Sequence, residues 1–173
     1  VIPDSVTTIG DSAFYDCDSI TDIRIPSSLT YLGNSSFANC DSLKNIEING
    51  NGATIGNYAF EYCYNVESIV IGDGVKNINY GAFYDNRNLK SLTISDSVET
   101  IGDYAFYNCR AFEELALSED LKTIGNWAFQ NCIGLKNISI GKNLSSISST
   151  AFYGDTALEN IEVSEDNATY SDY

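Results

Sequence analysis

Five cysteines are the residues in this chain best suited to metal or redox chemistry. All five recur at one position of a 23-residue repeat, where the two remaining copies carry Asn86 and Asp155. Zinc sites made of thiolates draw on close pairs such as C-x-x-C, and the sequence has none. We therefore predict a ladder of buried free thiols with no metal and no cofactor, although stacked neighbours would be near enough for an oxidised pair. The cysteines are Cys17, Cys40, Cys63, Cys109 and Cys132.

Acidic side chains in predicted turns raise the question of calcium binding. No EF-hand loop and no glycine-and-aspartate calcium repeat accompanies them, so solubility is the preferred interpretation. The residues concerned are Asp16, Asp18, Asp103, Asp155 and Asp166.

Carboxylates can also cleave polysaccharides when two of them are fixed across a groove, about 5–10 Å apart. Glu47, Glu114 and Glu162 are the candidates on one predicted face, but they lie in different and mostly non-adjacent repeats. We predict a solvated face with no catalytic residue, and hence no enzyme.

The charge balance excludes several classes of function. The 173 residues include 24 acidic and 9 basic side chains, which give a net charge of −15, and there is no histidine. Nucleic acids and anionic headgroups need a positive surface, and imidazole-dependent mechanisms need histidine. Apolar runs are only a few residues long, as at 69–71, so we expect no membrane insertion.

A repeat of 23 residues organises the whole chain. Seven copies without insertions leave only short ends, so we predict a single array over 1–173, with an incomplete first coil at 1–3 and an irregular tail at 164–173. We also expect the chain to be a piece of a longer polypeptide. The repeat is clearest in its phenylalanine column, which consists of Phe14, Phe37, Phe60, Phe83, Phe106, Phe129 and Phe152.

Each repeat contains two extended segments. The apolar and polar residues around Ile23 and Ile25 alternate as in a strand with one buried face, and a second short segment ends at Ile9-Gly10. The segment around Ala13-Phe14 has room for a single helical or 3₁₀ turn. One coil buries too little apolar surface to fold alone, because ordering each residue costs at least about 1 kcal/mol. We therefore predict a mostly β solenoid, with a parallel sheet on its concave side and short strands and helical turns on its convex side.

The fuller pattern is carried by residues such as Cys17, Ile20, Ile23, Ile25-Pro26 and Leu29. It resembles the BspA-like class of leucine-rich repeats, and the similarity covers nearly the whole chain. The resemblance implies an extracellular or cell-surface protein that is non-enzymatic and adheres to other macromolecules. It transfers no catalytic residue.

Two surfaces are candidates for binding a protein or glycan partner. The concave sheet is predicted to present Ser68, Val70, Ser91, Thr93, Glu114, Ala116, Asn137 and Ser139. The aromatic flank is predicted to present Tyr58, Tyr84, Tyr104, Tyr107 and Trp127. A passive spacer in a modular surface protein and, less favoured, a polysaccharide-acting solenoid are the alternatives. Uncapped terminal coils also predict end-to-end self-association.

Overall fold

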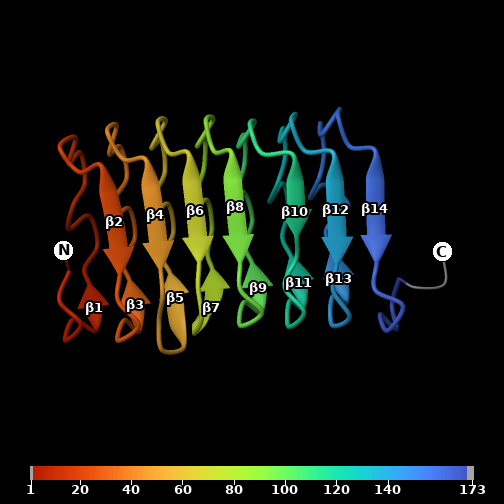
Figure 1. Cartoon of the computed structure of the whole chain (residues 1–173), viewed down its shortest axis with the longest axis horizontal. Helices are drawn as coiled ribbons and strands as arrows, with labels where there is room; N and C mark the ends of the chain where they lie inside the picture. Colours follow the sequence, from red (N-terminus) through yellow and green to blue (C-terminus); the bar gives the residue numbers. More distant parts are fainter. Residues whose placement is uncertain (1, 171–173) are drawn as a thin grey trace.

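The chain folds into stacked coils that form one β-solenoid. The structure is a computed structural model that describes residues 2–170. Each coil contributes one short strand and one longer strand, which run in opposite directions, and the coils follow one another along the long axis (Figure 1). The predicted leucine-rich-repeat solenoid is confirmed.

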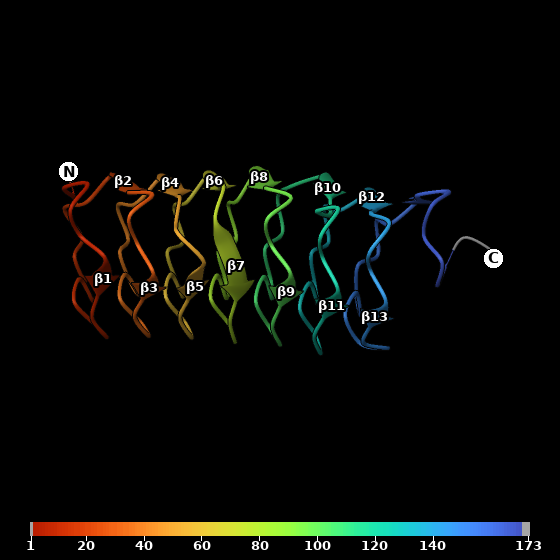
Figure 2. The same ribbon diagram turned by 90° about the horizontal axis from the view of Figure 1, so that it is seen from below.

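The longer strands lie along one side of the array (Figure 2). They pair in parallel with the expected register, since Ile23 pairs with Ile46 and Ile46 with Ile69. The sheet is divided, however, into a four-stranded part and a three-stranded part. The strands are β2 (Asp22–Ile25), β4 (Asn45–Ile48), β6 (Ser68–Ile71), β8 (Ser91–Ile94), β10 (Glu114–Ala116), β12 (Asn137–Ile140) and β14 (Asn160–Val163).

The short strands form a second parallel sheet, which is continuous through seven coils. A single register shift occurs between Ala53 and Thr54, where buried Ala53 pairs with Val75. Ala53 thus fills the apolar place that Gly52 leaves open in the repeat. The strands are β1 (Thr8–Ile9), β3 (Tyr31–Leu32), β5 (Ala53–Ile55), β7 (Val75–Ile78), β9 (Thr100–Ile101), β11 (Thr123–Ile124) and β13 (Ser146–Ile147).

The phenylalanine column forms the central ladder of the core. Neighbouring rings stack nearly parallel with centroids 4.8–5.4 Å apart, from Phe14 to Phe152. Phe37, Phe60, Phe83, Phe106 and Phe129 are fully buried. Because each ring packs against the same ring of the next coil, no coil has to bury its own apolar face.

The cysteine column is a ladder of free thiols beside these rings. Four thiols donate hydrogen bonds, at Sγ–O distances of 3.1–3.3 Å, to the carbonyl of the preceding coil's phenylalanine. Asn86 plays the same part in the fourth coil, where its Nδ2 donates to the carbonyl of Phe60 at 2.9 Å. The column therefore supplies a small buried donor to the second to sixth coils, which explains its occupancy there without metal or redox chemistry.

The predicted helical or 3₁₀ turn around each phenylalanine is wrong, because residues 2–170 contain no helix of either kind. Left-handed residues interrupt the segment on both sides of the phenylalanine, as at Ser12 (φ 54°) and Asp16 (φ 55°). Single turn bonds remain inside the segment, as from the Tyr15 amide to the Ser12 carbonyl at 3.2 Å, and they alternate with bonds between coils, as from the Phe14 amide to the Ser36 carbonyl at 2.8 Å. Stacking thus replaces the internal hydrogen bonds that a helical turn would need.

The glycine that follows most short strands allows two coils to approach closely. A Cβ on Gly33 would lie 2.4 Å from the carbonyl carbon of Gly10, so only glycine fits at this approach.

Residues 164–170 contain no strand, and they pack under the last coil. Asn167 is fully buried, and its Nδ2 donates to the carbonyls of Gly141 and Leu144 at 2.8 and 3.0 Å. Residues 1 and 171–173, which belong to the predicted end segments, lie outside the described residues. None of the residues from 2 to 170 forms a helix that could cross a lipid bilayer.

Candidate binding surfaces

The face of the longer strands carries the eight residues predicted on the concave sheet. Each strand alternates inward apolar and outward polar side chains, so Ser68 and Val70 point outward from β6 beside buried Ile69 and Ile71. Ser68 and Val70 pair in register with Ser91 and Thr93 on β8. Glu114 and Ala116 on β10 pair with Asn137 and Ser139 on β12.

A break between β8 and β10 divides these eight residues into two groups of four. In six coils the amide of the third residue after the cysteine position closes a turn, as Leu89 does onto Asn86 at 3.2 Å. Phe112 occupies this place in the fifth coil and does not make the bond. The backbone amide of Glu113 likewise makes no bond to the carbonyl of Lys90. One coil earlier the equivalent bond is present, from the amide of Lys90 to the carbonyl of Glu67 at 2.9 Å.

Phe112 is the residue that distinguishes the fifth coil. The two residues before it are not unusual, because Arg110 has an equivalent in Arg87 of the fourth coil and Ala111 in Ala157 of the seventh. The turn bond forms in both of those coils. Phe112 is itself buried to 1% exposure, in a place that Ile, Leu or Val fills elsewhere. We therefore attribute the break in the sheet to the larger ring of Phe112.

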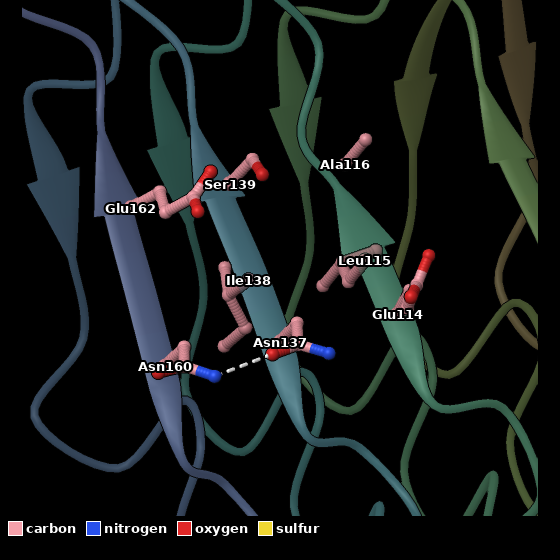
Figure 3. Close-up of a pocket in the computed structure, with 8 residues that line it drawn as sticks. All are labelled: Glu114, Leu115, Ala116, Asn137, Ile138, Ser139, Asn160 and Glu162. Atoms are coloured by element: carbon pink, nitrogen blue, oxygen red, sulfur yellow. Dashed lines mark hydrogen bonds between the residues drawn. The ribbon is translucent and has the colours of Figure 1, made fainter.

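A shallow hollow of about 260 Å³ lies over β10, β12 and β14. Figure 3 shows Glu114 and Glu162 on the two outer strands, with β12 between them, and Asn160 donating to Asn137 at 2.8 Å. The third candidate carboxylate, Glu47, is on β4 and is paired with Arg24 at 3.1 Å. The three carboxylates therefore lie on β4, β10 and β14, and no two of these strands are neighbours in the sheet.

A second surface, which we call the turn edge, is formed by the segments between each short strand and the next longer strand. Two rows of aromatic rings run along it. The first row links Tyr58, Tyr80, Tyr104 and Trp127, with neighbouring centroids 5.0–5.3 Å apart. The second row links Tyr62, Tyr84 and Tyr107, with neighbouring centroids 5.7 and 4.6 Å apart. The turn edge comprises 11–18, 34–41, 57–64, 80–87, 103–110, 126–133 and 149–156.

The two rows are joined into one aromatic surface. Tyr104 lies 5.7 Å from Tyr107 and 6.4 Å from Tyr84, centroid to centroid. All five residues predicted on the aromatic flank, Tyr58, Tyr84, Tyr104, Tyr107 and Trp127, therefore belong to a single cluster.

The sequence columns do not reveal Tyr62, Tyr64 and Tyr80, which also belong to this surface. Tyr80 is one position before the column of Tyr58 and Tyr104, which Gly81 occupies in the fourth coil. A Cβ on Gly81 would lie 2.7 Å from the ring of Tyr58, so the glycine leaves room for that ring while Tyr80 completes the row. The available signal is the glycine itself, which follows a tyrosine and stands in the column between Tyr58 and Tyr104.

Four of these aromatic residues have left-handed backbones, which bulky side chains rarely adopt. They are Tyr58 (φ 56°), Tyr62 (φ 59°), Tyr104 (φ 57°) and Trp127 (φ 53°). Other coils place Ser12, Ser35, Asn39 and Asn108 at the equivalent positions with the same sign of φ. Since this conformation costs a non-glycine residue roughly 1–2 kcal/mol, the rings are placed where polar residues would fold more easily.

The hydroxyls of Tyr58 and Tyr84 remain protonated at neutral pH. Partial burial, followed by the hydrogen bond with Tyr80, raises the pKa of Tyr58 to about 12. Partial burial, followed by the charge of Tyr107, raises the pKa of Tyr84 to about 12. The surface therefore offers neutral rings and hydroxyl groups to a partner.

The described residues contain no cluster of three His, Cys, Asp or Glu side chains arranged to hold a metal ion. Burial raises the pKa of Cys109 and that of Cys132, so both thiols stay neutral. The arrangement can therefore bind through aromatic and polar contacts, while the cysteine ladder serves the core.

Comparisons with known proteins match this architecture. The sequence profile of the BspA type leucine rich repeat region matches six copies over residues 1–111 and 76–173. A comparison with curated protein sequences gives no match.

Solved structures of bacterial repeat proteins are similar to the chain. A leucine rich cell surface protein from Faecalibacterium prausnitzii is 26% identical with a TM-score of 0.66, and the match covers 94% of this chain and 52% of that one. A leucine-rich repeat protein from Bacteroides ovatus is 21% identical with a TM-score of 0.72, over 95% and 54% of the two chains. The leucine rich repeat protein of T. pallidum is 22% identical with a TM-score of 0.66, over 95% and 64%.

The chain thus spans between half and two thirds of the length of these three proteins. The profile match extends over both halves of the sequence, and the coil register agrees with it. The chain therefore belongs to the BspA-type leucine-rich repeat family.

Proposed function

We propose that the array is a protein-binding module of a secreted or surface-displayed protein, and that the aromatic rows of the turn edge are its contact surface. The observation that carries this proposal is the continuity of the first row over the third to sixth coils and of the second row over the third to fifth. Tyrosine, tryptophan and arginine dominate the binding energy of protein interfaces. Rigid rings also lose little conformational entropy on binding.

The position of the rings supports a binding role over a purely structural one. Tyr64 and Tyr80 are 37% and 40% exposed, and the strained backbones of Tyr58 and Tyr104 are filled by serine in earlier coils. The left-handed backbone belongs to the repeat, but the repeat does not require an aromatic side chain at this position, so the rings are a reason to look for function. Surface display is supported by the Faecalibacterium prausnitzii relative, which is described as a cell surface protein.

The face of the longer strands is the second candidate surface. Its outward residues are mostly small. In the four-stranded part, which consists of β2, β4, β6 and β8, the exposed large apolar residue is Val70. Small residues rarely act as binding hot spots, so this face is the weaker candidate. A passive spacer would bind on neither face.

The test is binding of the array to a panel of purified matrix proteins and neutral glycans, measured by surface plasmon resonance. The double variant Tyr58→Ser and Tyr104→Ser uses residues that the same repeat position carries in Ser35, so the fold is retained. We expect it to weaken binding at least about tenfold, which corresponds to about 1.4 kcal/mol. The control Ser91→Arg and Thr93→Arg changes the other face and should leave the affinity within about twofold of wild type. A twofold change corresponds to about 0.4 kcal/mol of binding free energy.

The reverse result, with affinity lost only in the control variant, would assign binding to the longer strands. Failure of the wild type to bind any panel member at about 10 μM, a concentration that detects weak complexes, would favour the spacer. Cleavage of a glycan by the wild type would contradict the non-enzymatic assignment.

End-to-end self-association of the chain stays a prediction. Ile2, Val6 and Phe14 are only half-buried against the core at the first coil. Sedimentation velocity at increasing concentration would detect association, and a single monomer species at every concentration would contradict it.

A further inference from the structure

The turn edge already holds one guanidinium group. Arg87 places its guanidinium carbon 5.3 Å from the ring centroid of Tyr64. Its Nε and Nη2 donate to the carboxylate of Asp85 at 3.0 and 2.6 Å. Asp85 is only 3% exposed. A ring face and a carboxylate therefore bind an arginine side chain at the rim of the aromatic surface.

Negative charge on the turn edge is otherwise without basic partners. The segments of the edge contain eight carboxylates and two arginines, and all six lysines of the chain lie outside them. Arg110 is bonded through Nε to the Asn108 side chain at 2.6 Å. In the described part of the chain, Asp85 is the one carboxylate of the edge that pairs with a basic side chain. The eight carboxylates are Asp11, Asp16, Asp18, Asp41, Glu61, Asp85, Asp103 and Asp155.

Charges elsewhere on the array are paired in part, although acidic residues are still in excess. On the longer-strand side, Lys90 pairs with Glu67 at 2.8 Å and Lys136 with Glu113 at 2.8 Å. The turn edge has a net charge of −6 and the remaining residues a net charge of −9, so the edge differs in having seven carboxylates without an ion pair within residues 2–170.

Two of the carboxylates lie close to the rings. Glu61 follows the third phenylalanine, and burial, followed by the charge of Asp85, raises its pKa. Asp103 directly precedes Tyr104 in the first row. Asp103 accepts hydrogen bonds from the backbone and side-chain nitrogens of Asn126, which hold its carboxylate in place. A cation bound at either carboxylate would gain both carboxylate and ring contacts.

The dimensions suit an extended segment lying along the solenoid axis. The first row has four rings from Tyr58 to Trp127, each about one coil apart, with centroids 5.0–5.3 Å from their neighbours. An extended chain rises about 3.3 Å per residue. About five residues of a partner would therefore cover the row.

We propose that the turn edge binds an extended, arginine-rich segment of a partner protein, with guanidinium groups stacked on the tyrosine rings and bonded to Glu61 and Asp103. This inference rests on the proposed function and names the chemistry of its partner. Arginine fits better than lysine because its planar guanidinium stacks on rings and forks onto carboxylates at the same time. The Arg87, Tyr64 and Asp85 contact is the same arrangement within the chain.

The test uses hexa-arginine, hexa-lysine and a neutral oligosaccharide as probes of the full 173-residue chain. Trp127 is the single tryptophan and stacks on Tyr104 at 5.0 Å, so its fluorescence reports binding at the row. Calorimetry supplies the affinities. We expect saturable binding of hexa-arginine that is roughly three- to tenfold tighter than binding of hexa-lysine, at about 0.1 M salt.

Two sets of variants separate the site from general attraction to a polyanion. Glu61→Gln and Asp103→Asn install residues that other coils carry there, Gln130 and Asn34, so the fold is retained. Together they should weaken hexa-arginine binding about fivefold or more, since each removes a charge-assisted contact. Glu114→Gln and Glu162→Gln change the net charge equally on the longer-strand face, and should weaken binding less than about twofold.

A third variant tests the rings. Tyr62→Asn matches Asn39 and Asn108 in the same left-handed position, so its circular dichroism and melting should be unimpaired while hexa-arginine binding falls about threefold.

Four results would overturn the inference. These are equal weakening by the two pairs of carboxylate variants, equal affinity for hexa-arginine and hexa-lysine, undiminished binding by Tyr62→Asn, and saturable binding of the neutral oligosaccharide in place of the cationic peptides. A matrix protein could lose its binding to the double variant Tyr58→Ser and Tyr104→Ser and yet not be displaced by hexa-arginine from the wild type. That result would contradict the arginine-rich segment and leave the proposed function supported.

Discussion

The sheet of short strands runs unbroken through seven coils, whereas the sheet of longer strands in those same coils divides between β8 and β10. Both sheets have the same connections and the same 23-residue repeat. The unbroken side is flanked by the phenylalanine ladder, whose column has no exceptions. The divided side contains Phe112, the phenylalanine outside that column.

The cysteine column shows which departures a stacked array tolerates. Asn86 differs from cysteine in chemistry, but it is small and donates to the same carbonyl, so the turn beside it closes normally. Phe112 keeps the apolar character of its column and changes the size, and its turn opens. In a core packed at crystal density, volume is harder to accommodate than a change of donor atom.

The largest expected effect concerns the unbroken side. Phe83→Ala removes a fully buried ring stacked between Phe60 and Phe106. We expect unfolding to become about 3–5 kcal/mol easier, because a buried cavity is added to the lost transfer energy. Urea denaturation followed by circular dichroism measures the change.

Tyr153→Ala is the control for this variant, since Tyr153 is 66% exposed and should change stability by less than about 0.5 kcal/mol. Equal effects of the two substitutions would mean that the phenylalanine ladder contributes no more than the surface.

The second prediction repairs the divided side. Phe112→Leu installs the residue that Leu89 and Leu135 carry at the same position. We expect the turn bond onto Cys109 and the bond from the Glu113 amide to Lys90 to form, each contributing about 1 kcal/mol to local stability. Loss of ring volume offsets part of this in the global stability, so the sensitive measurement is hydrogen exchange at the amides of Phe112 and Glu113.

Slower exchange at residues 112 and 113 by about tenfold, the factor for about 1.4 kcal/mol, is the expected result. Phe106→Leu provides the contrast, because the same substitution in the ladder should accelerate exchange throughout the central coils. Unchanged exchange at 112 and 113 would show that Phe112 is not the cause of the break.

The sequence predicted the repeat register correctly because a fixed period places equal residues side by side. The pairing of Ile23 with Ile46 and the stacking of Phe60 on Phe83 follow directly from it. The left-handed turns were missed, although the column of Asp16, Asn39 and Asn108 carries residues that favour them. Counting residues to the phenylalanine suggested a helical turn, and stacking bonds between coils prevented it.

The candidate surfaces were predicted less completely. Alternation along a strand was enough to identify outward residues such as Ser68 and Glu114. It did not indicate that Phe112 divides their sheet, because the effect depends on ring volume against neighbouring backbone. Tyr80 was missed because its ring enters the aromatic row from the adjacent sequence position, beside Gly81.

The smallest expected effect is a pH dependence at the last departure in the cysteine column. Asp155 accepts a bond from the Cys132 amide at 2.8 Å, but its Oδ2 has no hydrogen-bond partner within the described residues. Burial raises the pKa of Asp155 to about 7, while the Cys132 amide opposes this shift. An ionised carboxylate cannot donate to the preceding phenylalanine carbonyl as the thiols and Asn86 do.

The sign of this effect follows from the raised pKa of Asp155 in the folded state. Below about pH 4 the carboxyl is protonated in both states, so its contribution to stability is fully present. Between about pH 4 and about pH 7 the unfolded chain releases the proton first, and the contribution is lost as the pH rises. Asp155→Asn keeps a donor at every pH and should exceed the wild type by about 1 kcal/mol above about pH 7. The difference between the two urea-denaturation curves should shrink as the pH falls to about 4, and parallel curves across that range would show that Asp155 is not part of the donor column.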